Sequence, residues 1–173
     1  MQSSAKIVIL IIATTTLSCG IILSNPKKPK TIIKKEELIN FRISIDEEDD
    51  VARQGIKAKL YINNIYHEKL EIQIPDCLRV AAPNLMYNNG YPVPMRSTIK
   101  ETCEPEWEAL EPGDEFTIEY PYNLFHDYYL ESGIEFTVQF SYYGEIRDSK
   151  SEFLSGDDDV IQSNVRKIRL VEY

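Results

Sequence analysis

Residue types that carry catalysis are scarce in this chain of 173 residues, and none of them forms a recognised motif. Of the two histidines, His67 flanks a predicted turn and His126 lies within an aromatic stretch. A hydrolytic triad requires a nucleophile, a base and an orienting carboxylate, yet no serine occupies a Gly-x-Ser-x-Gly elbow. The chain also lacks a His-Glu-x-x-His zinc motif and a glycine-rich phosphate loop. The sequence therefore predicts a non-catalytic protein without a cofactor. An enzyme with an unadvertised site, to be tested at the two histidines, is the alternative.

Two acidic clusters, residues 46–50 and 157–159, offer oxygen ligands of the kind that calcium prefers. Calcium is held by six to eight oxygens from a turn-like loop. Neither cluster has the spacing of a known calcium loop, although Gly156 allows a sharp bend before the second one. We expect both clusters to be solvated loop charge, and no metal site is predicted.

Charge is divided between a basic segment and an acidic domain. Five lysines, at positions 27, 28, 30, 34 and 35, precede the domain. From Leu38 onward, 13 Lys and Arg residues oppose 26 Asp and Glu residues, which leaves a net charge of −13. Such a domain repels phosphate backbones, so nucleic-acid binding is not expected. A basic protein partner would suit it electrostatically.

Aromatic and turn residues supply the candidate binding positions. Asn88-Asn89-Gly90 is a strong turn signal, and a group of aromatic residues runs from Tyr120 to Tyr129. Tyrosine buries a large area while keeping a polar tip, which favours interfaces, although the same residues could instead cap a sandwich core. The candidate binding residues are Tyr87, Asn89, Tyr91, Trp107, Tyr128 and Tyr129.

Alternating hydrophobicity predicts the strands that position these residues. The clearest strand, 134–142, places Ile134, Phe136, Val138, Phe140 and Tyr142 on one face. We expect strands over residues 41–45, 56–62, 70–74, 85–87, 91–93, 116–120, 134–142 and 165–171, an irregular segment over 103–111, and a short helical turn within 123–130. Seven to eight short strands without a long amphipathic helix predict an all-β, antiparallel sandwich.

The second half of this domain resembles the immunoglobulin-like domains of bacterial surface proteins. The similarity rests on two motifs, Leu110-Glu111-Pro112-Gly113-Asp114 and Gly133-Ile134-Glu135-Phe136-Thr137-Val138, each of which leads into a strand. The closing Ser163-Asn164-Val165 before a terminal strand fits the same pattern. The resemblance implies an immunoglobulin-like β-sandwich over residues 38–173, and it specifies a fold rather than a function.

The first nineteen residues resemble the export signal of bacterial lipoproteins. Lys6 is followed by the apolar run 7–13 and then by Thr16-Leu17-Ser18-Cys19-Gly20, as a secretory signal with a small residue before the cut requires. The family usually has leucine three places before the cysteine, where this chain has Thr16. The resemblance implies a signal peptide over 1–18, a diacylglyceryl and an acyl chain such as palmitate on Cys19, and a lipidated basic tether over 19–37. Gly20 in place of aspartate favours the outer membrane or periplasm over the inner membrane.

Two other interpretations of the leader stay open. Residues 7–25 carry no charge and are long enough to span a bilayer as an uncleaved anchor. An ordinary cleaved signal, with Cys19 incidental, is the second. The lysines after the apolar run oppose export under the positive-inside rule, although beside a membrane they would be attracted to anionic headgroups.

The cysteine count agrees with export. With Cys19 assigned to lipid, Cys77 and Cys103 remain, and such a pair in an oxidising compartment commonly forms a disulfide. Closing the loop between them would add on the order of 3 kcal/mol of stability. Two separate buried thiols are the alternative.

These observations predict a non-catalytic envelope lipoprotein whose acidic sandwich binds a protein partner. An inhibitor or immunity-type role against a basic protein would account for the negative charge. An envelope accessory or structural domain without a tight ligand is the alternative among non-enzymes. The partner and the oligomeric state do not follow from the sequence.

Overall fold

The computed structural model of the chain describes residues 32–45, 57–96, 103–104, 106–131, 133–156 and 158–169. These residues belong to one compact unit, Thr31–Tyr173. The predicted signal peptide, Cys19, most of the predicted tether and the acidic cluster 46–50 lie outside the described residues, as do the side chains of Phe125 and His126. Within the described ranges, no helix has the length and apolar character needed to cross a membrane.

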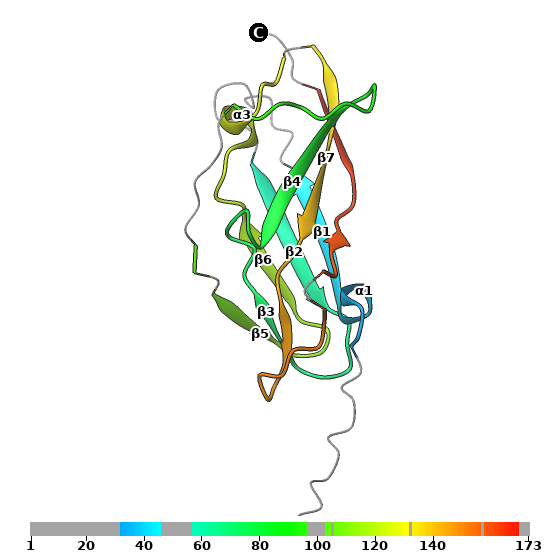
Figure 1. Cartoon of the computed structure of the whole chain (residues 1–173), viewed down its shortest axis with the longest axis vertical. Coiled ribbons are helices and arrows are strands. Elements are labelled where there is room, and N and C mark those ends of the chain that lie inside the picture. Colours follow the sequence, from blue (N-terminus) through cyan, green and yellow to red (C-terminus); the bar gives the residue numbers. More distant parts are fainter. Residues whose placement is uncertain are drawn as a thin grey trace, which may run out of the picture. The chain divides into compact units, whose positions relative to one another are not determined.

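Ten short strands in three antiparallel sheets make up almost all of the regular structure in the described ranges (Figure 1). The first sheet has the order β1-β2-β6, the second β10-β7-β4 with β9 also paired to β7, and the third β5-β3-β8. The strands are β1 (Ile39–Ile45), β2 (Ala58–Asn64), β3 (Leu70–Gln73), β4 (Ala81–Tyr87), β5 (Trp107–Leu110), β6 (Glu115–Glu119), β7 (Glu135–Tyr142), β8 (Ile146–Asp148), β9 (Ile161–Gln162) and β10 (Arg166–Arg169), and the helices are α1 (Lys35–Leu38) and α3 (Leu124–Asp127).

The chain passes between the second and third sheets twice, from β3 to β4 and from β7 to β8. Strand β4 pairs with β7 in the second sheet, and β3 pairs with β8 in the third. The Phe41 ring on β1 packs against Tyr142 on β7, with ring centroids 5.6 Å apart, which joins the first sheet to the second. The strand orders β1-β2-β6 and β10-β7-β4 correspond to the orders A-B-E and G-F-C of immunoglobulin-like sandwiches. The predicted all-β, antiparallel sandwich is therefore confirmed.

The core follows from the alternation seen in the sequence. On β7, Phe136, Val138, Phe140 and Tyr142 are buried, because successive side chains of a strand point to opposite faces. The Tyr142 hydroxyl donates a 2.8 Å hydrogen bond to the Gln73 carbonyl, which satisfies this polar atom inside the core. Gly144 leaves room for the same ring, since a Cβ there would collide with the Tyr142 hydroxyl oxygen. Tyr142 thus fixes the passage from β7 to β8.

Several predicted elements differ from the structure. The strand expected over 91–93 is only an isolated bridge between Pro92 and Met86, and β4 begins at Ala81 rather than at residue 85. Residues 103–111, expected to be irregular, contain β5, which pairs with β3 over four residues. Glutamates disfavour strands, but cross-strand pairing decides the conformation here. Strands β8 and β9 were not predicted because they are only three and two residues long. The helical turn expected within 123–130 is α3.

Cys77 and Cys103 are joined in a disulfide, with an S–S distance of 2.17 Å and Cα atoms 6.5 Å apart. Cys77 lies in the segment 74–80, which connects β3 to β4 and is longer than the facing connection 143–145 between β7 and β8. Cys103 stands shortly before β5. The bridge therefore ties this connection to the segment that leads into the third sheet.

The described end of the predicted tether packs on the sandwich. The Ile33 N–H donates to the Leu154 carbonyl at 2.9 Å, and Lys35 is only 1% exposed. The Lys35 ammonium donates to the Tyr143 carbonyl at 3.1 Å and to the Asp159 carbonyl. Its backbone N–H donates to the Asp159 carboxylate at 2.5 Å. A buried charge needs such partners, and they anchor the segment before β1.

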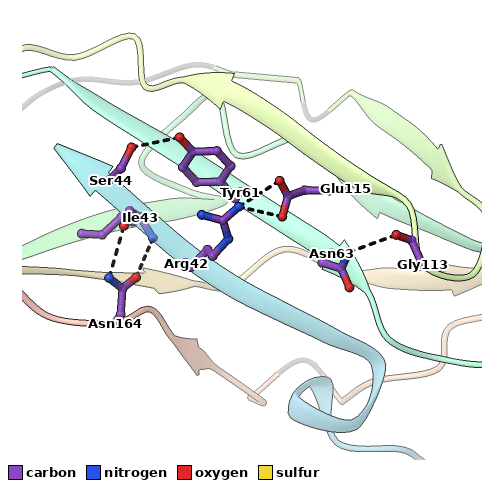
Figure 2. A network of polar contacts seen from close by, with 8 residues as sticks. All are labelled: Arg42, Ile43, Ser44, Tyr61, Asn63, Gly113, Glu115 and Asn164. Carbon is purple, nitrogen blue, oxygen red and sulfur yellow. Dashed lines mark hydrogen bonds and ion pairs between the residues drawn. The ribbon is translucent and has the colours of Figure 1, made fainter. Parts of the chain in front are cut away.

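The outer face of the first sheet is covered by paired polar groups (Figure 2). The Arg42 guanidinium lies 3.9 Å from the centroid of the Tyr61 ring and donates two 2.9 Å hydrogen bonds to Glu115. Lys57 pairs with Glu119 at 2.8 Å on the same sheet. These charges contact each other across β1, β2 and β6, which is the arrangement of a solvated sheet face.

Candidate functional site

Exposed apolar side chains gather at one end of the sandwich, where β4 ends and β7 begins. Tyr91 is 70% exposed and Tyr129 54% exposed, although large aromatic side chains are usually mostly buried. We call this surface the loop end and define it by Met86, Tyr91, Met95, Tyr129 and Ile134. These are five of the eleven large hydrophobic residues that are exposed within the described ranges.

The turn after β4 forms one side of the loop end. The Tyr87 N–H donates to the Tyr91 carbonyl at 2.9 Å, and Gly90 has the positive φ of 83° that a tight hairpin requires. The Asn89 side-chain oxygen accepts the Tyr91 N–H at 3.1 Å, which closes the turn locally. Asn88 donates to the Glu135 carboxylate at 2.9 Å and thereby fastens the turn to β7. The predicted hairpin therefore presents Tyr91 from a fixed backbone.

The segment after α3 forms the other side. The Tyr129 N–H donates to the Pro94 carbonyl at 2.9 Å, and Met95 forms a bridge with Tyr128. The Arg96 side chain donates to the Tyr128 carbonyl at 2.8 Å and lies 5.4 Å from the centroid of the Tyr129 ring. The Tyr87 hydroxyl donates to the Tyr129 carbonyl at 3.1 Å, which links the two sides. Residues distant in sequence thus form one surface.

A groove of about 400 Å³ lies at the loop end between the turn and the start of β7. Its apolar surface comes from Tyr87 and Ile134, and its carboxylates are Glu131 and Glu135. Asn88 and Asn89 supply amide groups. A mixture of aromatic, aliphatic and acidic groups suits a partner side chain with an apolar stem and a positive end.

Tyr128 does not belong to the exposed surface, which corrects its assignment as a binding residue. It is only 6% exposed, and its hydroxyl donates to the Pro83 carbonyl at 3.1 Å inside the sandwich. Burial, reinforced by the negative charge of Asp127, raises the pKa of Tyr128 to about 12. Neighbouring residues outside regular strands can point in opposite directions, and here Tyr128 faces the core while Tyr129 faces solvent.

Trp107 lies elsewhere, on β5 of the third sheet, well away from the turn after β4 in Figure 1. The Arg147 guanidinium lies 3.7 Å from the centroid of the Trp107 ring and 4.5 Å from that of Phe153. Glu145 pairs with Arg147 at 3.6 Å. We call Trp107, Arg147, Phe153 and Glu145 the Trp107 cluster. The structure thus brings Tyr87, Asn89, Tyr91 and Tyr129 together and places Trp107 apart.

The residues considered for catalysis and metal binding are not assembled into a site in the described part of the chain. His67 is exposed, 3.6 Å from Glu68, with its ring 4.2 Å from the Tyr66 ring. No group of three or more His, Cys, Asp or Glu side chains that could hold a metal ion occurs among the residues described. Asp157 lies outside them, while Asp159 contacts Lys35.

Two members of the loop end, Met86 and Met95, were missed in the sequence. Met86 is outward-facing on β4, between the buried Leu85 and the inward Tyr87, so strand alternation could have identified it. Ile134 was counted with the core face of β7 but precedes the strand and is exposed. Met95 follows two prolines and has no pattern that would have revealed its exposure.

No protein-family model matches this chain, and no curated protein matches its sequence significantly.

Proposed function

We propose that this protein is a non-catalytic envelope lipoprotein that binds a protein partner at the loop end. The observation that carries the proposal is the concentration of exposed aromatic and methionine side chains on a surface whose backbone is held by hydrogen bonds. Aromatic residues and methionine are enriched in protein interfaces, and a fixed surface loses little conformational entropy on binding.

The position of the N-terminal segment supports a tethered arrangement. In Figure 1, α1 and the start of β1 lie toward the opposite end of the sandwich from the turn after β4. If Cys19 carries a lipid, the tether would join the sandwich through α1, toward the end opposite the turn after β4. A cleaved lipoprotein signal, lipidation of Cys19 and location at the outer membrane or in the periplasm are parts of this proposal.

The acidic character supports a basic partner. The chain has a net charge of −9 and a calculated pI near 4.8. Glu131 and Glu135 line the groove of the loop end. An inhibitor or immunity-type role against a cationic protein fits both features, because complementary charge accelerates association and selects partners.

Site-specific photo-cross-linking in cells tests the loop end directly. A photoreactive residue at Tyr91 is expected to capture one discrete partner, and the same residue at Thr117, exposed on the outer face of the first sheet, is not. Adding Tyr129→Ser should abolish the Tyr91 cross-link, and high salt should weaken it. Equal capture from both positions, or capture that ignores Tyr129→Ser, would refute binding at the loop end.

Intact mass of the membrane-extracted protein tests the anchor. Loss of residues 1–18 with gain of a diacylglyceryl and an acyl group, both abolished by Cys19→Ala, is the expected result. An unprocessed mass would contradict the lipoprotein part of the proposal. Binding at the loop end would still be decided separately, by the cross-linking test.

A further inference from the structure

The turn after β4 holds an asparagine that is placed to react with its own backbone. Asn89-Gly90 is the only Asn-Gly pair in the chain, and both residues are exposed at the tip of the hairpin. Asparagine is chemically labile, because the backbone nitrogen of the next residue can attack its side-chain amide where no side chain obstructs the approach. A Cβ at Gly90 would meet no atom within 4 Å apart from its chain neighbours, so the attacking nitrogen stands in open space.

A hydrogen-bond donor already contacts the oxygen on which charge develops in this reaction. The Tyr91 N–H donates to the Oδ1 of Asn89 at 3.1 Å. Attack on the Asn89 Cγ turns Oδ1 into an oxyanion, and a positioned backbone N–H stabilises such a charge. The Nδ2 atom, which has to leave, donates to no group in the described part of the chain. The turn therefore supports the developing charge and does not hold the leaving group.

The other asparagines that the structure describes lack this combination. Asn40 is followed by Phe41 within β1, and Asn123 is followed by Leu124, so a side chain hinders attack in both cases. The remaining ones use their amide nitrogens in hydrogen bonds within the protein, and they are Asn63, Asn64, Asn84, Asn88 and Asn164. Asn89 thus differs from its counterparts both in its successor and in its free amide nitrogen.

One contact of the turn opposes the reaction. The Gly90 N–H donates to the Tyr87 carbonyl at 2.9 Å, and this bond engages the proton that the attacking nitrogen has to give up. A single hydrogen bond at the exposed tip of a hairpin opens by a local fluctuation, without unfolding of the sheet. We therefore expect the fold to slow the attack relative to the unfolded chain without preventing it.

We propose that Asn89 is a site of spontaneous deamidation in the native protein, through a succinimide formed with Gly90. The Gly90 nitrogen bonds to the Asn89 Cγ while the Cγ–Nδ2 bond breaks, and Nδ2 leaves as ammonia with the proton of the Gly90 N–H. Water then opens the ring. Hydrolysis at the side-chain carbonyl leaves aspartate at this position, and hydrolysis at the backbone carbonyl leaves isoaspartate.

Both products alter the loop end. Asn89 lines its groove together with Glu131 and Glu135, so aspartate adds a third carboxylate there and strengthens the attraction for a cation. Isoaspartate adds a carbon atom to the backbone of the turn that presents Tyr91, and so changes the position of that ring. The deamidation itself requires no partner, whereas its effect on a partner rests on the proposed function.

Peptide mapping by mass spectrometry tests the site in the full chain, incubated at mildly alkaline pH. The same chain unfolded in denaturant serves as the clock, because no hydrogen bond restrains the turn there. In the native chain, conversion of amide to acid should appear at Asn89 before any other asparagine, with both aspartate and isoaspartate as products. The proposal is overturned if native Asn89 is still intact when the unfolded chain has converted fully, or if another asparagine converts first.

The variant Gly90→Asn tests the route through the succinimide. Gly90 has a φ of 83°, and asparagine is the residue after glycine that best tolerates this conformation, so the turn should keep its shape. Its side chain hinders the attack and should slow the conversion of Asn89 many-fold, whereas Tyr129→Ser, which leaves the Asn-Gly pair intact, should convert like the unaltered protein. Unchanged thermal unfolding shows that both variants fold. Equal conversion in Gly90→Asn would indicate direct hydrolysis and overturn the proposal.

The mapping experiment and the cross-linking experiment fail independently. Mapping uses no partner, and cross-linking from Tyr91 is done on freshly prepared protein in which Asn89 is still an amide. A missing cross-link with conversion at Asn89 would refute binding at the loop end alone. A cross-link with no conversion in the native chain would refute the deamidation site alone.

Discussion

The Trp107 cluster and the loop end use similar side chains in opposite ways. In the Trp107 cluster, the Arg147 guanidinium lies close to two aromatic rings, 3.7 Å from Trp107 and 4.5 Å from Phe153. At the loop end, Arg96 lies 5.4 Å from the Tyr129 ring, which stays 54% exposed. In the first region Arg147 contacts two aromatic rings, although Phe153 stays 45% exposed, whereas the loop end presents the Tyr129 ring to solvent beside a more distant guanidinium. Residue type alone therefore does not identify an interface; coverage by the protein's own side chains does.

The largest expected effect separates the buried Tyr128 from its neighbour Tyr129 of the loop end. Tyr128→Ala should lower the free energy of unfolding by about 3–5 kcal/mol, because it empties a buried aromatic site. Tyr129→Ala should cost less than about 1 kcal/mol, because that side chain is exposed. Denaturant unfolding of both variants measures the difference. Similar losses would mean that the loop end is packed as tightly as the core.

Loss of the disulfide should weaken the side of the molecule that carries the Trp107 cluster. Cys103→Ser is expected to cost about 2–4 kcal/mol, because the unfolded chain regains the freedom of the loop between Cys77 and Cys103. Hydrogen exchange should then accelerate at β5 more than at the turn after β4. A uniform acceleration, or the same stability with and without reductant, would contradict this expectation.

A smaller effect tests the coupling within the Trp107 cluster. A double-mutant cycle of Trp107→Ala and Arg147→Ala should give a coupling energy of about 0.5–2 kcal/mol, as expected for a guanidinium stacked on an indole. The matched cycle of Tyr129→Ala and Arg96→Ala should give less, since those groups lie farther apart. Equal coupling in the two cycles would remove the distinction between the covered and the open region.

A further effect is confined to alkaline pH. The pKa of Tyr128, raised to about 12, exceeds the ordinary value near 10, so the unfolded chain loses this proton first. The free energy of unfolding should therefore fall as the pH rises from about 10 toward about 12. Burial also raises the pKa of Tyr142, so Tyr128→Phe should remove only part of the fall. Tyr129→Phe, at an exposed position, should retain the full fall in the free energy of unfolding. Chemical unfolding of the two variants across this pH range measures the difference.

Much of the fold could be predicted because alternating side chains record which face of a strand is buried. Strand β7 is the best example, with its apolar residues on the core side. β5 escaped detection because its glutamates disfavour strands, and only pairing with β3 makes the segment extended. Lys35 looked like part of a solvated cluster, but its carbonyl partners lie more than 100 residues away in the sequence.

The candidate site was predictable only in part, because contacts between segments distant in the sequence decide which of its side chains are exposed. The signal Asn88-Asn89-Gly90 placed a turn correctly, and that turn presents Tyr91. Nothing local distinguishes Tyr128 from Tyr129, since the buried one is selected by the Pro83 carbonyl of β4. The contact of the Trp107 ring with Arg147 was equally invisible, because Arg147 lies forty residues later in the chain.

The buried lysine also determines how a mechanical load passes through this domain. Ile33 and Lys35 bond to Leu154, Tyr143 and Asp159 before the chain enters β1. A pull on the chain ahead of Ile32 is therefore borne first by these bonds to the last third of the sequence, and only afterwards by the ladder between β1 and β2. The hydrogen bonds of the Lys35 ammonium must therefore break before β1 can separate from β2.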